Sequence, residues 1–250
     1  MKALLLFFFS LFILSDVPAQ DIAQLIKEGD RLENLPDEKK AFEKFKEVLH
    51  IQPSNLYTLN KCSELCSRIG KRQLDAKRRD DYYEAAKTYA SLALKISPAN
   101  AEANCVMAIV LGRISLTKGG KEKINNAKEI KKHVDIALKS DPHNYKAWHV
   151  LGRWHYEISN LNMFERAAVK VLFGGLPKAS LKESIQAFEK AHQLAGGFIL
   201  NYYEMARAYQ QEGQKKKAAA LIRTMLQLPD KTEDDAAIKA DGKKLLKELE

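Results

Sequence analysis

The chain has 250 residues, of which 46% are apolar and 29% are charged, and it carries a formal net charge of +9. This composition, with 12 glycines and 7 prolines, allows a sizeable hydrophobic core and excludes a disordered or collagen-like chain. No stretch alternates apolar and polar residues as a half-buried strand does. The sequence therefore predicts an all-α protein.

The N-terminus has the layout of a secretion signal. A basic residue, Lys2, precedes an apolar run, and small residues lead up to Ala19. This pattern is typical of a cleaved signal peptide, so we expect residues 1–19 to be removed and residues 20–250 to form the exported domain, periplasmic or secreted. The alternative is a membrane anchor formed by residues 3–15, although the run is short for a span.

Turn-forming residues recur at a regular spacing along the rest of the chain. Three helix ends carry a proline followed two residues later by an asparagine, and the prolines, at positions 53, 98 and 142, are 45 and 44 residues apart. Proline stops one helix and asparagine caps the next. Two further junctions fall at Gly196-Gly197 and Pro229. The punctuation predicts five two-helix repeats and a C-terminal capping helix, at about residues 22–55, 56–100, 101–144, 145–198, 199–231 and 232–250.

The second helix of each repeat carries apolar residues three or four positions apart. This spacing places them on one helix face, which we expect to pack on the first helix of the same repeat. These residues are Ala41, Phe45, Val48, Ala86, Ala90, Ala93, Ile130, Val134, Ala137, Phe188, Ala191, Ala218, Ile222 and Met225.

The fourth repeat contains the most informative motif. Trp148, Leu151 and Gly152, followed later by Phe188 and Ala191, match half of a tetratricopeptide repeat, a two-helix unit of about 34 residues. Such units stack into a right-handed α-solenoid whose inner groove holds a partner. The motif therefore predicts a non-enzymatic protein-interaction scaffold.

Other chemistry is not indicated. The sequence has no nucleophile-elbow, zinc-protease or phosphate-loop motif, and its six histidines are scattered. Its three cysteines, Cys62, Cys66 and Cys105, are predicted to be small buried residues, because no other ligands complete a metal site near them in the sequence. We expect no catalytic residue, no metal and no cofactor.

Residues 147–194 carry a resemblance to a known family. They contain a Leu-Gly-x-Trp motif at residues 151–154, an inserted helix ending in an apolar run at residues 170–173, and the helix SIQAFEKAHQL. In these features the stretch resembles the C-terminal tetratricopeptide domain of the regulator of microtubule dynamics family. The resemblance implies a non-catalytic helical domain associated with microtubules and spindle poles. Tubulin is an expected partner only if the N-terminal segment is not a secretion signal.

The first helix of each repeat predicts the lining of the concave groove. The candidate binding residues are Asn60, Arg68, Arg113, Lys146, His149, Arg153, Tyr203 and Arg207. Arginine donates two parallel hydrogen bonds to a carboxylate or phosphate, so this positive lining favours an acidic or extended protein or peptide, with anionic lipid as a further candidate. A second interpretation stays open, in which the arginines pair with acids such as Glu157 and Glu204. Acids interspersed among the basic residues argue against nucleic acid.

The insertion at residues 160–177 supports an alternative function. Phe164, Leu172 and Phe173 are candidates for a mobile apolar lid over the groove, as in a lipid-binding or lipid-transfer protein. The other interpretation of this segment is structural. In that case Phe164, Val171 and Leu172 pack on the outer edge of the fourth and fifth repeats.

Overall fold

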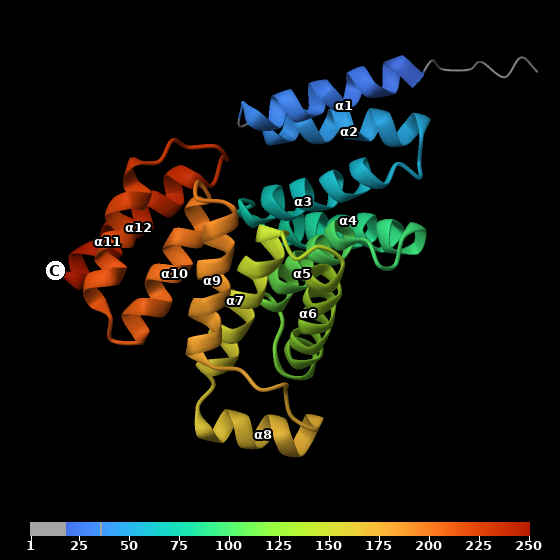
Figure 1. Ribbon diagram of the computed structural model, residues 1–250. Helices are drawn as coiled ribbons and strands as arrows, with labels where there is room; N and C mark the ends of the chain where they lie inside the picture. Colours follow the sequence, from blue (N-terminus) through green and yellow to red (C-terminus); the bar gives the residue numbers. More distant parts are fainter. Residues whose placement is uncertain (1–18, 36) are drawn as a thin grey trace, which may run out of the picture.

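The computed structural model describes residues 19–35 and 37–250 (Figure 1). In these residues it contains twelve α-helices and no β-strand, which confirms the predicted all-α class. Apart from Ala19, the first residue of α1, the predicted secretion signal and the alternative anchor lie outside the described residues. The helices are α1 (Ala19–Asn34), α2 (Glu38–Ile51), α3 (Leu56–Lys71), α4 (Ala76–Ile96), α5 (Ala101–Ser115), α6 (Gly120–Ser140), α7 (Tyr145–Ser159), α8 (Met163–Phe173), α9 (Leu181–Leu194), α10 (Ile199–Gln211), α11 (Lys215–Gln227) and α12 (Asp235–Leu249).

The helices pack in consecutive pairs that form an α-solenoid. The pairs are α1 with α2, α3 with α4, α5 with α6, α7 with α9, and α10 with α11, and α12 covers α10 and α11. The first helices of neighbouring pairs also meet, because α5 contacts α3 and α7, and α7 contacts α10. Side chains from these four helices therefore share one side of the stack.

Asparagine caps begin three of these first helices, as the sequence predicts. The side chains of Asn55, Asn100 and Asn144 each accept a hydrogen bond, of 2.8 to 3.0 Å, from the backbone N–H three residues later. Each cap satisfies an N–H that the helix itself leaves without a partner. The caps fix where α3, α5 and α7 begin, and so they set the register of the side chains that face the groove.

The core lies between the two helices of each pair. All fourteen residues predicted for the second-helix faces are buried, and Phe45 and Phe188 are fully so. Glycine on the first helix makes room for these rings. A Cβ atom at Gly29 would lie 2.7 Å from Phe45, and one at Gly152 would lie 2.6 Å from Phe188. Ser184 adds a buried hydrogen bond of 2.8 Å to the carbonyl oxygen of Gly152.

Two glycines on equivalent first helices are expected to respond in opposite directions to alanine. Gly152→Ala should lower the free energy of unfolding by about 1–3 kcal/mol, because the added methyl group overlaps the Phe188 ring. Gly112→Ala should raise it by up to about 1 kcal/mol, since nothing lies within 4 Å of the new Cβ and alanine favours a helix interior. Urea unfolding of both variants measures the difference, and an equal effect would contradict this account of the packing.

The two ends of the solenoid meet through polar contacts. The backbone N–H of Glu38, at the start of α2, donates a 2.8 Å hydrogen bond to Glu233 in the α11–α12 connection. Arg72, which follows α3, contacts Glu38 at 2.5 Å and Asp234 at 3.4 Å. In Figure 1 this connection reaches from the red end of the chain toward the blue and teal helices. The contact limits how far the groove can open at this end.

Helix α8 projects from the opposite end of the molecule (Figure 1). Asn162 and Glu165 form a capping box at its start, and Gly174, with a φ of 70°, ends it in the left-handed region that favours glycine. Arg166 donates three hydrogen bonds of 2.8 to 3.0 Å to carbonyl oxygens at the end of α7 and just beyond it. These polar contacts anchor α8, although it shares only a small contact with α6.

Candidate binding groove

Ion pairs join the predicted groove residues across helices. Lys146 on α7 lies 2.6 Å from Glu64 on α3 and 3.0 Å from Glu102 on α5. Burial opposes ionisation of Glu64, but the charges of Lys146 and Arg68 outweigh it and lower the pKa of this carboxyl to about 2. The structure therefore brings together residues that are 38 to 82 positions apart in the sequence.

The cluster around Arg68 contains acids from the first pair of helices. Arg68 lies 2.5 Å from Glu33, 3.3 Å from Glu38 and 3.8 Å from Glu64. Lys61 shares Glu33 at 2.7 Å. Arg68 is thus held by carboxylates of the chain itself, and its guanidinium group is not free for a ligand.

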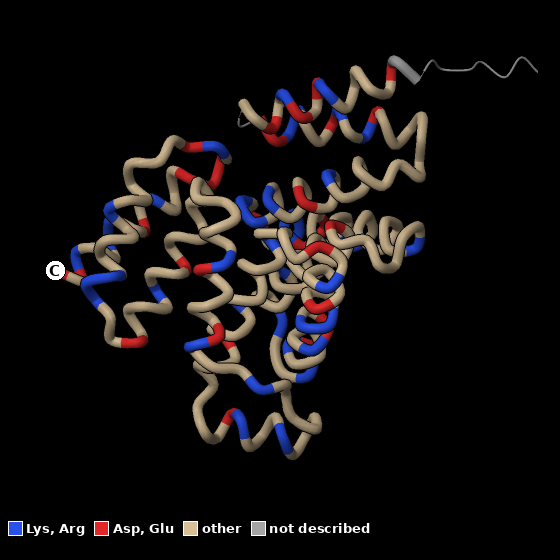
Figure 2. Tube along the Cα trace, in the orientation of Figure 1, with Lys and Arg blue, Asp and Glu red and all other residues tan. Residues whose placement is uncertain are grey.

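Arg153 and Arg207 share one buried acid. Glu204, only 4% exposed, lies 2.6 Å from Arg153 and 2.9 Å from Arg207, and Arg153 also contacts Glu157 at 3.3 Å. Of the two interpretations left open by the sequence, the structure shows the paired one. Figure 2 shows acidic and basic residues interleaved along the stacked helices. The expectation that the arginines make the inner surface positive is therefore wrong.

His149 is not a groove residue, which corrects the sequence prediction. It is 6% exposed, packs against Phe188 and Phe198, and shares a 3.0 Å hydrogen bond with Asn201. Burial lowers the pKa of its ring to about 3, so the ring is neutral. The groove stripe on α7 passes through Lys146 and Arg153, and His149 is rotated about 60° from it toward α9 and α10.

Tyr203 lies at the far end of the stripe. It is half-buried and, with Arg207, borders a shallow hollow of about 240 Å³ between α10 and α12. The guanidinium of Arg207 stacks 5.0 Å from the Tyr156 ring and 6.0 Å from the Tyr203 ring. These contacts hold Arg207 in place rather than present it to a ligand.

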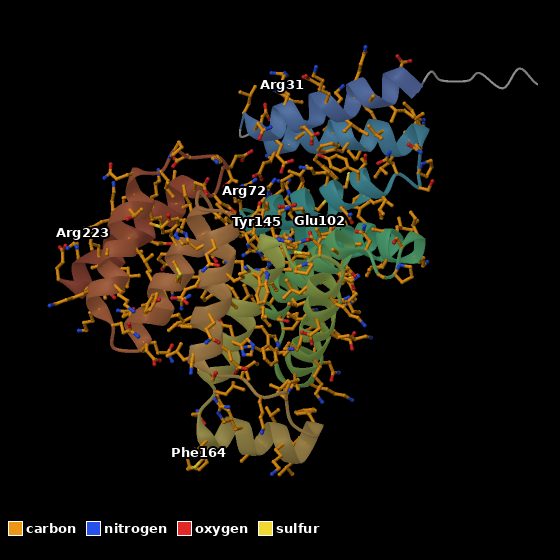
Figure 3. All side chains as sticks on the ribbon, in the orientation of Figure 1. Arg31, Arg72, Glu102, Tyr145, Phe164 and Arg223 are labelled. Atoms are coloured by element: carbon orange, nitrogen blue, oxygen red, sulfur yellow. The ribbon has the colours of Figure 1, made fainter. Side chains whose placement is uncertain are left out.

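A pocket of about 440 Å³ opens where α3, α5 and α7 begin. Its lining residues are Leu56, Tyr57, Asn60, Lys61, Asn100, Glu102 and Lys146. Figure 3 labels Glu102 near the start of α5 and Tyr145 at the start of α7, whereas Phe164 lies away from both on α8. The pocket lies on the side of the stack that these first helices share.

Asn60 is the unusual group in this pocket. It is 6% exposed, and its Oδ1 atom has no hydrogen-bond partner in the described part of the chain. Its Nδ2 atom makes one long contact, 3.5 Å, with Oδ1 of Asn100. A buried acceptor without a donor costs about 1–3 kcal/mol, so a ligand N–H at this place would be stabilising. Sequence reasoning assigned Asn100 only to a helix cap and missed its place in the pocket.

Arg113 differs from the other basic groove residues. It is half-buried near the end of α5, and within residues 19–35 and 37–250 it has no hydrogen bond and no carboxylate within 4.0 Å. Arg68, Lys146, Arg153 and Arg207 each have at least one such carboxylate.

The apolar residues of α8 do not pack as the structural interpretation expects. Phe164, Val171 and Leu172 are 80%, 83% and 68% exposed, and Met163 is 76% exposed. These side chains are exposed because α8 is rotated so that Val169 and Phe173 face the protein instead. Lys128 also donates a 2.6 Å hydrogen bond to the carbonyl oxygen of Phe173. None of the predicted lid residues Phe164, Leu172 and Phe173 lines the pocket at α3, α5 and α7.

Neither a metal-ligand cluster nor a membrane-spanning helix is found among the described residues. The three cysteines are buried and free, and no group of three or more metal-ligating side chains comes together within residues 19–35 and 37–250. Among the helices described, none has both the length and the hydropathy that crossing a bilayer requires.

The paired helices, their glycine–phenylalanine packing and the shared concave side define a tetratricopeptide-like α-solenoid. Solved structures of this class match the fold. A tetratricopeptide-repeat protein of Thermus thermophilus superimposes with a TM-score of 0.65 at 12% identity, over 90% of this chain and 98% of that one. PilW, a type IV pilus biogenesis factor, gives a TM-score of 0.55 at 15% identity, over 93% and 91%.

The chain belongs to the regulator of microtubule dynamics protein 1-3 family, whose model matches residues 25–250. Regulator of microtubule dynamics protein 3 of Xenopus laevis is 31% identical over 162 residues, covering 64% of this chain and 35% of the relative. Protein 2 of Homo sapiens is 27% identical over 176 residues, covering 70% and 43%, and protein 3 of Bos taurus is 26% identical over 235 residues, covering 92% and 49%. The matched region therefore spans less than half the length of each of these relatives.

Proposed function

We propose that this chain is a non-catalytic scaffold that binds an extended polypeptide segment on its concave side, at the pocket where α3, α5 and α7 begin. The observation that carries the proposal is the buried, unpartnered acceptor of Asn60. A backbone N–H of an extended segment supplies the missing donor, and Leu56 and Tyr57 offer apolar surface to a neighbouring side chain.

The charges of the groove favour an extended segment over a polyanion. Lys61 and Lys146 line the pocket, but both are already held by carboxylates of the chain. A polyanion would have to displace these internal acids, whereas a peptide backbone would not. The names of the relatives connect the family with microtubules, so tubulin is one candidate polypeptide. It meets this groove only if the protein is not exported after Ala19.

Replacing the acceptor is expected to weaken binding while stabilising the fold. Random 12-residue peptides displayed on phage are selected on the purified chain, and enriched peptides are then titrated calorimetrically. Asn60→Leu should bind them about tenfold more weakly, which corresponds to the loss of one hydrogen bond to a buried acceptor. The same variant should unfold at an equal or higher urea concentration, because it removes a buried polar atom that has no partner in the free protein.

Asn125→Leu is the matched control for this experiment. Asn125 is exposed on α6 and lies outside the pocket, so its replacement should leave peptide affinity unchanged. Failure of the chain to enrich any peptide, or equal affinity of the Asn60→Leu variant, would refute the proposal.

A second candidate function is attachment to a lipid surface through α8. Met163, Phe164, Ala167, Ala168, Val171 and Leu172 follow the spacing of one helix face, and all six are exposed. Lys170 borders this face, where a basic side chain reaches lipid headgroups. The chain's net charge of +9 favours an anionic surface.

Vesicle sedimentation separates this function from peptide binding. The chain should sediment with phosphatidylcholine vesicles that contain phosphatidylserine, and less with phosphatidylcholine alone. The double variant Phe164→Ser, Leu172→Ser should stay in solution yet melt at an unchanged temperature, because both side chains are already exposed. A lowered melting temperature, or dimers of the wild-type chain that the substitutions abolish, would instead assign the face to protein packing.

A further inference from the structure

Among the basic residues predicted for the groove, Arg113 alone has no carboxylate at contact distance within the described part of the chain. Each of the other basic residues predicted for the groove contacts a carboxylate at 3.0 Å or less. Arg113 has none within 4.0 Å in the part of the chain that the structure describes, and its guanidinium donates no hydrogen bond there. Up to five N–H groups of one half-buried side chain are thus available to a ligand.

Tyr83 on α4 and Gly112 on α5 are the neighbours of Arg113 that matter for a binding site. The side chain of Tyr83 is 5% exposed, and its hydroxyl has no hydrogen bond among the described residues. Tyr83 packs in one apolar cluster with Val110 and Ile114 of α5, so it lies against the turn of α5 that carries Arg113. Burial raises the pKa of its hydroxyl, and the charge of Arg113 partly offsets this rise. Gly112 precedes Arg113 on α5, and apart from its chain neighbours no atom lies within 4 Å of the position a Cβ would take there, so α5 has open space at this turn.

The pKa of Arg113 is shifted in the opposite direction from the pKa values of Arg68 and Arg207. Burial, and after it the charge of Arg153, lowers the pKa of Arg113. Burial also opposes the charges of Arg68 and Arg207, but neighbouring carboxylates outweigh it and raise the pKa of both. Glu204 and Asp234 act on Arg113 only from beyond 4 Å. A ligand anion at contact distance would supply the nearby negative charge that Arg113 lacks.

We propose that Arg113 and the Tyr83 hydroxyl together bind one carboxylate, from an Asp or Glu side chain of the polypeptide held in the groove. This inference rests on the proposed function and adds a second point of recognition to it. Glu102 at the pocket and Arg113 are eleven residues apart on α5, about 16 Å along the helix axis. An extended chain covers that distance in about five residues. The bound segment therefore carries its acid about five residues from the backbone group at Asn60.

The charge balance of the groove selects a carboxylate over a phosphate. The ion pairs of the groove and of the contact between the two ends of the solenoid contain seven cations and nine carboxylates. The cations are Lys61, Arg68, Lys71, Arg72, Lys146, Arg153 and Arg207, and the carboxylates are Asp30, Glu33, Glu38, Glu64, Glu102, Glu157, Glu204, Glu233 and Asp234. With Arg113 there are eight cations and nine carboxylates before a ligand binds, and a dianion would add twice as much negative charge to this surplus as a singly charged carboxylate. A singly charged carboxylate fits the bidentate geometry of one guanidinium.

Peptide selection with altered charge at residue 113 tests the proposal. The same phage library is selected on the wild-type chain, on Arg113→Gln and on Arg113→Glu. Wild-type peptides should carry Asp or Glu at one fixed position, and Arg113→Gln and Tyr83→Phe should each bind them more weakly, by about tenfold or more for the arginine variant. Arg113→Glu should select Lys or Arg at that position instead.

Arg223→Gln is the control, since Arg223 is exposed on α11 and lies at the edge of the molecule in Figure 3. Peptides that need Asn60 but show no fixed acid, or that bind Arg113→Gln as well as wild type, would overturn this inference and leave the proposed function standing. If no peptide is enriched, the proposed function fails. In that case the nuclear magnetic resonance signal of the Arg113 Nε–Hε group is followed while sodium acetate is added. A saturable shift that is absent at Arg223 supports a carboxylate site at Arg113, and the lack of any shift refutes it.

Discussion

Glu204→Gln is expected to lower the free energy of unfolding by about 3 kcal/mol. The glutamate is 4% exposed and holds Arg153 and Arg207 at 2.6 and 2.9 Å, so its neutralisation leaves two arginines without their shared counter-ion. Removing one partner of a buried ion pair costs about 3–5 kcal/mol, and the partial exposure of both arginines places this case at the lower end. Urea unfolding at neutral pH measures the loss.

Glu157→Gln provides the matched comparison. Glu157 contacts the same Arg153 at 3.3 Å, but its side chain is 53% exposed. A solvent-exposed ion pair contributes at most about 1 kcal/mol, so this variant should unfold close to wild type. Similar losses in the two variants would show that Glu204 does not hold the groove together in the way the structure indicates.

The stability of the fold is expected to fall as the pH drops below about 6.5, with His149 as a main cause. Burial lowers the pKa of His149 from 6.5 to about 3. Between these values the unfolded chain binds a proton that the folded chain does not, so each pH unit downward costs up to about 1.4 kcal/mol. The pKa values of His133 and His155 are also lowered by burial and add to the same trend.

His149→Gln separates this contribution from the rest. Glutamine does not titrate and retains a donor for Asn201, so the free energy of unfolding should depend less steeply on pH between 6.5 and 4.5. His50→Gln, at an exposed position on α2, should keep the wild-type slope. Urea unfolding at several pH values gives both slopes, and a wild-type slope in the His149→Gln variant would mean that His149 is accessible to protons in the folded state.

The sequence predicts the local structure of this protein well because the relevant signals are local. The asparagines at residues 55, 100 and 144 cap helices through contacts only three residues long. The apolar spacing that identifies the second helices requires only helical geometry. Gly152 and Phe188 match the two helices of the repeat motif, so their contact is expected although the insertion at residues 160–177 separates them.

Whether the charged residues of the groove are free or ion-paired could not be predicted from local signals. Whether Arg153 is free or paired depends on Glu204, 51 residues later, and the contact of Glu38 with Glu233 spans 195 residues. Such pairs depend on how far each repeat rotates against the next, which a sequence pattern does not specify. His149 illustrates the sensitivity, because a rotation of about 60° around α7 separates a groove position from a buried one.

The same limit applies to the residues that carry the proposed function. Asn100 has a clear local role as a helix cap, and only the stacking of α3 against α5 reveals its contact with Asn60. Arg113 looks equivalent to Arg68 and Arg153 in the sequence. It becomes distinct only when the positions of all surrounding carboxylates are known.

Mapping a selected peptide by nuclear magnetic resonance tests the central claim most directly. Amide signals of the isotope-labelled chain are followed while an enriched peptide is added. Binding on the concave side predicts that the largest shifts fall at Tyr57, Asn60 and Asn100, and on α5 near Arg113. Shifts concentrated instead on α8, or on the second helices α4, α6, α9 and α11, would contradict it.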